Sequence, residues 1–214
     1  MKLFQIIASA QGSRAFSNMG QAFGFGDELM AQAVRYFIPP MSKAIEKRAQ
    51  TPEGLLSVLQ FLGSRRYDRF LDDPRIFGHA QVQKEGERVL QYLFVREART
   101  RKIVENRAKV LPIPVEALEK MLPFIAVMVI GAIEVKTRRP LGVIWHRIAK
   151  GEPASRELAN PYLALVQHLK KQERDQKDYR RRRLFAYFGL GSEPAAEPGA
   201  AEPALEAPAL FQSA

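Results

Sequence analysis

A basic segment followed by aromatic residues is the part of this chain whose residue types point most directly to a chemistry. Between Lys170 and Arg183 the chain carries eight cations against three carboxylates. The cations and the aromatic side chains that follow them are Lys170, Lys171, Arg174, Lys177, Arg180, Arg181, Arg182, Arg183, Phe185, Tyr187 and Phe188. Cationic side chains bind phosphates and displace the counterions of a nucleic-acid backbone. This segment is our first candidate for binding an anionic partner.

Three interpretations of the basic segment stay open at this point. Its cations can bind nucleic-acid phosphates while Tyr179 or Tyr187 stacks on exposed bases. Its aromatic end can instead lie on an anionic membrane surface such as that of the inner membrane. The third interpretation is a charged helix end that only faces solvent.

A second basic strip runs from Arg96 to Lys109 and carries six cations against two carboxylates. The cations are Arg96, Arg99, Arg101, Lys102, Arg107 and Lys109. Mixed charges at these spacings are typical of an exposed helix. If the strip and the basic segment meet on one surface, the pattern favours phosphate binding.

Catalytic chemistry finds little support in the residues. The chain has no cysteine, and His79, His146 and His168 are far apart in sequence. A metal site would need carboxylates gathered from distant helices. We therefore expect no cofactor, no metal and no enzymatic activity, and a protein that acts by binding another protein, an anionic partner or a second copy of itself.

Two apolar segments with helical spacing contain proline, and they indicate the fold. They run from Asp27 to Arg48 and from Val115 to Arg139. Proline removes a helical hydrogen bond, so we expect both helices to bend within a compact bundle. The uncharged stretch from Met121 to Ile133 is shorter than the roughly twenty residues of a membrane span, and a buried core helix explains it better.

The remaining helices follow from start and stop residues. Thr51-Pro52 predicts the start of a helix that covers Leu55 to Leu62. Further helices are predicted at His79–Val95, Arg96–Lys109, Leu141–Lys150 and Ser155–Arg183. No long stretch alternates with period two, so the predicted fold class is all-α.

Composition bears on where the protein works. The absence of cysteine suits a reducing compartment. The apolar run from Leu3 to Ala8 is too short for a secretion signal. We therefore expect a cytoplasmic protein.

The last 26 residues, 189–214, differ in composition from the rest. They are rich in alanine, proline and glutamate and contain neither lysine nor arginine. Such a sequence buries too little apolar surface to fold, so we expect a disordered tail. Its four glutamates mean that the net charge of +10 for the whole chain rises to +14 over residues 1–188.

Several short motifs in a fixed order carry a family resemblance. They are Ala10-Gln11-Gly12, Phe23-Gly24-Phe25-Gly26, Gly86 to Phe94, Met121-Leu122-Pro123 and Ile130-Gly131-Ala132. Over Leu3 to Arg139 the chain resembles the YidB-like family of bacterial proteins of unknown function. The resemblance implies an all-helical, homeodomain-like fold and no activity. One departure follows Phe94, where Val95-Arg96-Glu97 replaces the glycine-containing turn expected for the family.

Together these observations predict three parts of the chain. Residues 1–140 form a YidB-like helical domain, residues 141–188 a basic helical extension and residues 189–214 a disordered tail. The predicted function is binding through a basic surface, together with self-association. Nucleic-acid binding and attachment to the inner membrane surface are the two alternatives.

Overall fold

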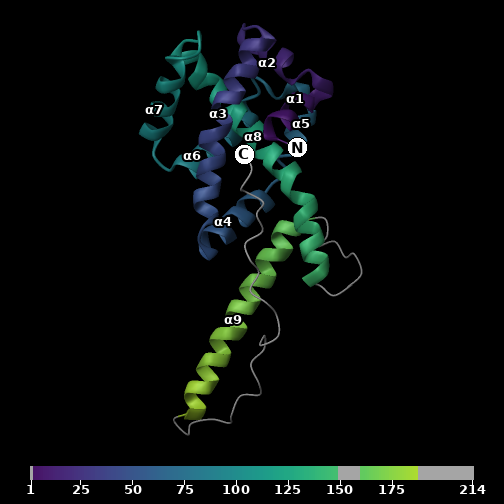
Figure 1. Cartoon of the computed structure of the whole chain (residues 1–214), viewed down its shortest axis with the longest axis vertical. Coiled ribbons are helices and arrows are strands. Elements are labelled where there is room, and N and C mark those ends of the chain that lie inside the picture. Colours follow the sequence, from purple (N-terminus) through teal and green to yellow (C-terminus); the bar gives the residue numbers. More distant parts are fainter. Residues whose placement is uncertain (1, 149–159, 188–214) are drawn as a thin grey trace.

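The structure is built from helices packed around one central helix (Figure 1). The computed structural model describes residues 2–148 and 160–187, with side chains described up to residue 144 and from 160 to 179. Its helices are α1 (Leu3–Ser13), α2 (Ala15–Phe23), α3 (Asp27–Ala49), α4 (Pro52–Gly63), α5 (Arg69–Asp72), the short 3₁₀ helix η1 (Pro74–Ile76), α6 (Ala80–Phe94), α7 (Glu97–Ala108), α8 (Val115–Ile148) and α9 (Pro161–Tyr187). The described residues contain no strand, which confirms the all-α prediction.

Helix α8 is the central helix, and α1, α3, α5, α6, α7 and α9 all contact it. Every residue from Met121 to Ile133 is buried, as expected for a helix that is apolar on all sides. The prediction of a buried core helix is therefore confirmed. None of the helices in the described residues combines the length and hydropathy that crossing a membrane requires.

Proline does not end either of the two long helices. Pro39 and Pro40 lie inside α3, and Pro123 and Pro140 lie inside α8. A proline leaves the carbonyl four residues earlier without its helical donor. For the first three prolines those carbonyls belong to Arg35, Tyr36 and Glu119, which are exposed residues, so water can bond to them.

Helices α6 and α8, which are far apart in sequence, cross in close contact at Gly86 and Pro123. A Cβ atom placed on Gly86 would lie only 2.1 Å from the carbonyl oxygen of Pro123. A second close approach occurs further along α8, where a Cβ atom on Gly131 would lie 2.7 Å from the carbonyl oxygen of Tyr67. Because glycine has no side chain, the backbone at Pro123 can contact α6 at Gly86, and the backbone at Tyr67 can contact α8 at Gly131.

The N-terminal turn predicted at Ala10-Gln11-Gly12 is a sharp bend in α1. Gln11 and Gly12 have φ values of 54° and 63°. The side chain of Gln11 holds the bend, because its Nε2 donates to the carbonyl of Asp73 (3.0 Å) and its Oε1 accepts from Asn18 (2.7 Å). The bend thereby ties the start of the chain to the connection between α5 and η1.

The C-terminal helices differ from the prediction. A separate helix beginning at Leu141 is wrong, because α8 continues through Pro140 to Ile148. The next helix begins at Pro161, and its predicted start at Ser155 lies outside the described residues. The tail of residues 189–214 and Phe188 also lie outside them. The division of the chain at residue 140 stays a prediction.

We expect Gly86→Ala to destabilise the fold by about 3 kcal/mol, because the new methyl group would force α6 away from α8. Gly142→Ala is the matched control, since Gly142 also lies inside a helix, α8, and nothing lies within 4 Å of an added Cβ. The control should gain roughly 0.5–1 kcal/mol from helix propensity. Denaturant unfolding followed by circular dichroism measures both, and equal effects of the two variants would contradict the close crossing.

Candidate interaction surfaces

The C-terminal part of α9 projects beyond the body of the molecule (Figure 1). Its first turns pack against α4 and α8, where Tyr162, Leu165 and Val166 are buried. From Lys170 to Asp178 every residue is exposed. We call residues 170–187 of α9 the arm.

Three predicted cations form a ridge along the arm. Lys170, Arg174 and Lys177 follow one another at spacings of four and three residues, so they share one face of the helix. Lys177 bonds to Glu173 at 2.6 Å, and this ammonium group lowers the pKa of the Glu173 carboxyl. Lys171 is exposed beside the ridge. Arg180 to Arg183, Phe185 and Tyr187 continue α9, and their side chains lie outside the described residues.

The arm is positioned by contacts at the start of α9. Asn160 precedes the helix, and its Nδ2 donates to the carbonyl of Gly63 at the end of α4 (2.7 Å). The Tyr162 hydroxyl donates to the backbone carbonyl of Glu134 (3.0 Å) and lies 2.8 Å from the Thr137 hydroxyl. These bonds fix α9 to both α4 and α8, and thereby fix the direction of the arm.

A polar cluster surrounds this attachment and extends from the core to the surface. Its members are Arg66, Asp68, Glu134, Thr137, Arg138 and Tyr162, of which Glu134, Thr137 and Tyr162 are buried and Arg66 is exposed. Glu134 is fully buried where the apolar part of α8 ends. Its carboxylate accepts a hydrogen bond from the backbone N–H of Asp68 (3.0 Å) and another from the guanidinium of Arg138. A buried carboxylate needs such partners because its charge is no longer hydrated.

The electrostatics of the cluster follow from its hydrogen bonds and its burial. The Arg66 guanidinium donates to both carboxylate oxygens of Asp68 (2.9 and 2.7 Å), and it lowers the pKa of that carboxyl. The same bonds raise the pKa of Arg66. Burial raises the pKa of Tyr162, which keeps this hydroxyl protonated as a donor.

The predicted second basic strip lies on α7 and does not form a uniform positive surface. Arg101 pairs with Glu105 at 3.3 Å. The guanidinium carbons of Arg99 and Arg107 lie 5.9 Å and 5.7 Å from the ring centres of Phe94 and Tyr36. The other three cations are exposed, Arg96 before the helix, Lys102 within it and Lys109 at its end.

The basic strip and the arm do not meet on one surface. Figure 1 shows α7 and the arm at opposite ends of the molecule. Two adjacent-arginine sequences, Arg65-Arg66 and Arg138-Arg139, add further positive charge. Three of these four arginines are paired with carboxylates, because Arg65 bonds to Glu85 (3.1 Å), Arg66 to Asp68 and Arg138 to Glu134. The arm is therefore the stronger of the two predicted basic sites.

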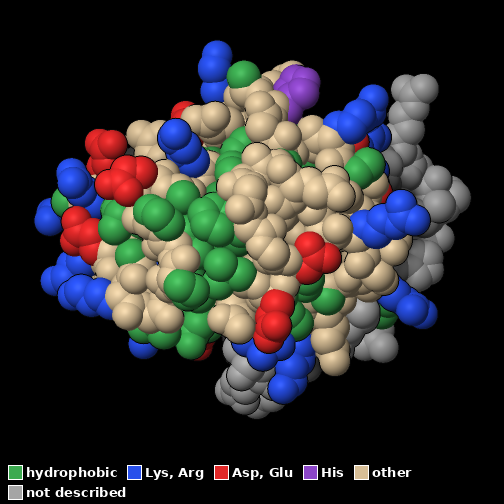
Figure 2. Space-filling view, turned by 90° about the horizontal axis from the view of Figure 1, so that it is seen from above, with side chains coloured by type: hydrophobic (Ala, Val, Ile, Leu, Met, Phe, Trp, Pro, Cys, Tyr) green, Lys and Arg blue, Asp and Glu red, His purple; other side chains and the backbone are tan. Residues whose placement is uncertain are grey.

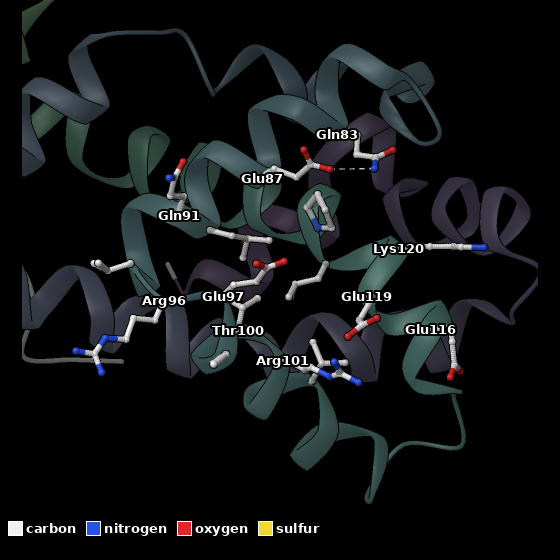
Figure 3. A pocket seen from close by; sticks show the side chains of 16 residues that line it. Gln83, Glu87, Gln91, Arg96, Glu97, Thr100, Arg101, Glu116, Glu119 and Lys120 are labelled. Carbon is white, nitrogen blue, oxygen red and sulfur yellow. Dashed lines mark hydrogen bonds between the residues drawn. The ribbon is translucent and has the colours of Figure 1, made fainter.

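A groove of about 1120 Å³ lies between α6, α7 and the first turns of α8 (Figure 3). Its lining includes the buried apolar residues Leu90, Val104 and Leu122. Carboxylates from all three helices surround them. Seen from the end opposite the arm, hydrophobic side chains gather on the α7 side of the molecule, and acidic and basic side chains border them (Figure 2).

One residue in the wall of the groove has a strained backbone. Val95 joins α6 to α7 with φ 61° and ψ −45°, and the N–H of Arg96 donates to the carbonyl of Phe94 (2.6 Å). This is a γ-turn with a positive φ at its centre, a rare conformation that is especially unfavourable for a β-branched residue. The family resemblance led us to expect glycine in this turn, and the backbone still has the conformation that favours glycine.

The sequence analysis missed both the cluster and the groove. The spacing of four residues between Glu134 and Arg138 was visible, but nothing in the sequence showed that Glu134 is buried. The groove is formed by α6, α7 and α8, whose charged residues look like ordinary solvent-facing residues. Among the described residues, no three His, Asp or Glu side chains are arranged to hold a metal ion.

We expect Tyr162→Phe to destabilise the protein by about 1–1.5 kcal/mol, since it removes one buried hydrogen-bond donor. Tyr36→Phe is the control, because the Tyr36 hydroxyl has no hydrogen bond within the described residues and its ring stays beneath Arg107. Thermal and denaturant unfolding report the difference. An unchanged stability of Tyr162→Phe would show that its hydroxyl does not hold α9 in place.

We expect Val95→Gly to stabilise the protein by about 1 kcal/mol, because relief of backbone strain exceeds the added entropy of the unfolded chain. The side chain of Val95 is 69% exposed, so little packing is lost. Val110→Gly provides the comparison, as an exposed valine without a positive φ. It should lose stability in the same unfolding experiment, and a loss in both variants would argue against strain at Val95.

Comparison with known proteins places this architecture in a family. The model of a family described as bacterial protein of unknown function (DUF937) matches residues 5–135. No curated protein and no solved structure matches the chain, and the homeodomain-like likeness stays a prediction. The matched region covers more than half of the chain and contains α1 to α7 with the buried part of α8. The chain therefore belongs to this family of bacterial proteins of unknown function.

Proposed function

We propose that the protein is a non-enzymatic binding protein of the bacterial cytoplasm and that its arm binds nucleic acid. The observation that carries this proposal is the ridge of Lys170, Arg174 and Lys177 on a helix that projects from the body. Charged residues that only keep a protein soluble can lie on the surface of its body and do not require a helix that projects from it. The anchoring of α9 through Asn160 and Tyr162 supports a fixed orientation of the ridge.

The dimensions of the ridge suit a phosphate backbone. Lys170 and Lys177 are separated by about 10 Å along the helix axis, from a rise of about 1.5 Å per residue. One strand of duplex DNA presents about three phosphates over that length. Once Lys177 exchanges its bond to Glu173 for a phosphate, the three cations of the ridge can neutralise a similar number of charges without dependence on base sequence.

Nucleic acid suits the exposed arm better than a membrane does. A helix that lies on a bilayer needs an apolar face. From Lys170 to Asp178 the arm has no apolar residue on any face. The cations along this length therefore favour a polymer that is bound from the aqueous phase.

The test is the salt dependence of binding to duplex DNA and to single-stranded RNA, measured by fluorescence anisotropy. The variant carries Lys170→Gln, Arg174→Gln and Lys177→Gln, and we expect its slope of log K against log salt to fall by about 2–3. Its affinity at low salt should fall by at least about tenfold.

A control variant removes the same charge from the opposite end of the molecule. It carries Lys102→Gln, Lys109→Gln and Lys120→Gln, all exposed residues, and its slope should stay within error of the unmodified protein. Equal slopes in the two variants would overturn the proposal, because net charge alone would then explain binding. Flotation with anionic vesicles, without binding to either nucleic acid, would assign the arm to a membrane surface instead.

A further inference from the structure

The groove between α6, α7 and α8 has the chemistry of a docking site for a cationic helix. Glu87, Glu97 and Glu119 line the groove. Figure 3 shows the carboxylates of Glu97 and Glu119 turned toward it, whereas Arg96 and Lys120 extend away from it. The Glu87 carboxylate lies at its α6 side, where it accepts a hydrogen bond from the side chain of Gln83 (3.0 Å). The remaining cation of the lining, Arg101, is paired with Glu105. The rim is therefore acidic, although cationic residues also belong to the lining of the groove.

The walls of the groove add hydrogen-bond acceptors to this negative rim. Pro123 lies in the lining and has no N–H, so the carbonyl of Glu119 lacks its helical donor. Lysine and arginine carry donors and no acceptors. A partner rich in arginine would match both the carboxylates and this carbonyl.

The floor of the groove is apolar, and one exposed apolar side chain lies at its acidic rim. Leu90, Val104 and Leu122 line its floor, and the exposed side chain of Val95 stands at its edge. Glycine would relieve the strain at Val95, so a valine at this position reduces the stability of the fold. A contact between the Val95 side chain and a partner in a complex would compensate for this strain.

The chain itself contains a segment with the complementary composition. The last turns of α9 read Arg180 to Arg183, followed by Leu184, Phe185 and Tyr187. Leu184 and Tyr187 are three positions apart and share a face of the helix. Arginines would meet the acidic rim while these apolar residues reach the floor.

A molecule cannot place this segment in its own groove. The arm extends about 27 Å past Leu169, taking a rise of about 1.5 Å per residue, and it points away from α6 and α7 (Figure 1). The groove is therefore accessible only to the arm of another molecule. Such an interface joins two different surfaces, and repetition of it produces chains or rings.

We infer that the groove lined by Glu87, Glu97 and Glu119 binds the end of α9, Arg180 to Tyr187, of a second copy of this protein, so that molecules associate head to tail. This goes beyond the proposed function, because it gives the arm a second ligand and assigns a role to a surface that does not contact nucleic acid. Nucleic acid bound along the ridge and a groove that holds Arg180 to Tyr187 then compete for the same arm.

Charge reversal with mutual rescue tests the inference in the full-length protein, freed of nucleic acid. One variant reverses the groove with Glu87→Lys, Glu97→Lys and Glu119→Lys. The other reverses the arm with Arg180→Glu, Arg181→Glu, Arg182→Glu and Arg183→Glu. Sedimentation velocity over a concentration series should show self-association of the unmodified protein, weakened at least about 100-fold in each variant.

An equimolar mixture of the two variants decides the outcome. Each variant supplies the charge that the other lacks, so mixing should restore association between them. Association that survives reversal of the groove would overturn the inference, as would an unmodified protein that stays monomeric or a mixture that stays monomeric. Circular dichroism checks that the variants fold, which is expected because all three glutamates are exposed.

Val95→Gly tests the contact with a variant whose weaker association could not be explained by misfolding. This variant should be more stable than the unmodified protein and yet associate several-fold more weakly. A gain in stability with unchanged association would remove Val95 from the interface and overturn its assigned contact.

The test also separates this inference from the proposed function. The groove-reversed variant keeps its arm, frees it from the competing groove and carries more positive charge, so it should bind DNA at least as tightly as the unmodified protein. If DNA binding is intact and the mixture of the two variants does not associate, only the inference of a head-to-tail contact is contradicted. Rescue in the mixture without any effect of the ridge substitutions on DNA binding removes only the nucleic-acid proposal.

Discussion

The contact of two backbones at Gly86 and Pro123 is the constraint on which the rest of the structure depends. Because Gly86 has no side chain, α6 lies directly on α8 and shields one side of its apolar surface. The chain then reverses at Val95, and α7 passes over the first turns of α8. The groove is the space that remains where α7 diverges from this crossing. One small residue thereby determines both the burial of the central helix and the shape of the surface beside it.

A second constraint acts at the other end of the buried part of α8. Glu134 marks the point where this helix changes from fully apolar to polar, and its carboxylate is neutralised by groups from two sides. The same turn carries the carbonyl that accepts the Tyr162 hydroxyl. The polar boundary of the core and the attachment of the arm are therefore one structural unit. A change in the packing around Glu134 would alter the direction in which the arm leaves the body.

Much of the fold could be predicted from local features of the sequence. Thr51-Pro52 begins α4 as predicted, with the Thr51 hydroxyl accepting from the N–H of Gly54, and the all-apolar run of α8 is buried. The continuation of α8 past Pro140 could not be predicted from a proline rule that considers a helix in isolation. The basic residues of the arm could be recognised in the sequence. The projection of the arm from the body could not, because it depends on contacts of Asn160 and Tyr162 with residues far away in the sequence. The groove could not be predicted from the sequence. Its carboxylates come from α6, α7 and α8, and they lie around one surface only in the folded molecule.

The position of the central helix along the chain has a consequence for synthesis on the ribosome. Helices α1, α3, α5 and α6 leave the ribosome before the residues of α8 that they contact have been made. At about 5–20 residues per second, their apolar faces lack a central partner for on the order of ten seconds. The nascent chain is thus dependent on chaperones, or on short-lived contacts among its first helices, until Ile133 has emerged. A sequence with its core helix at the beginning would not have this interval.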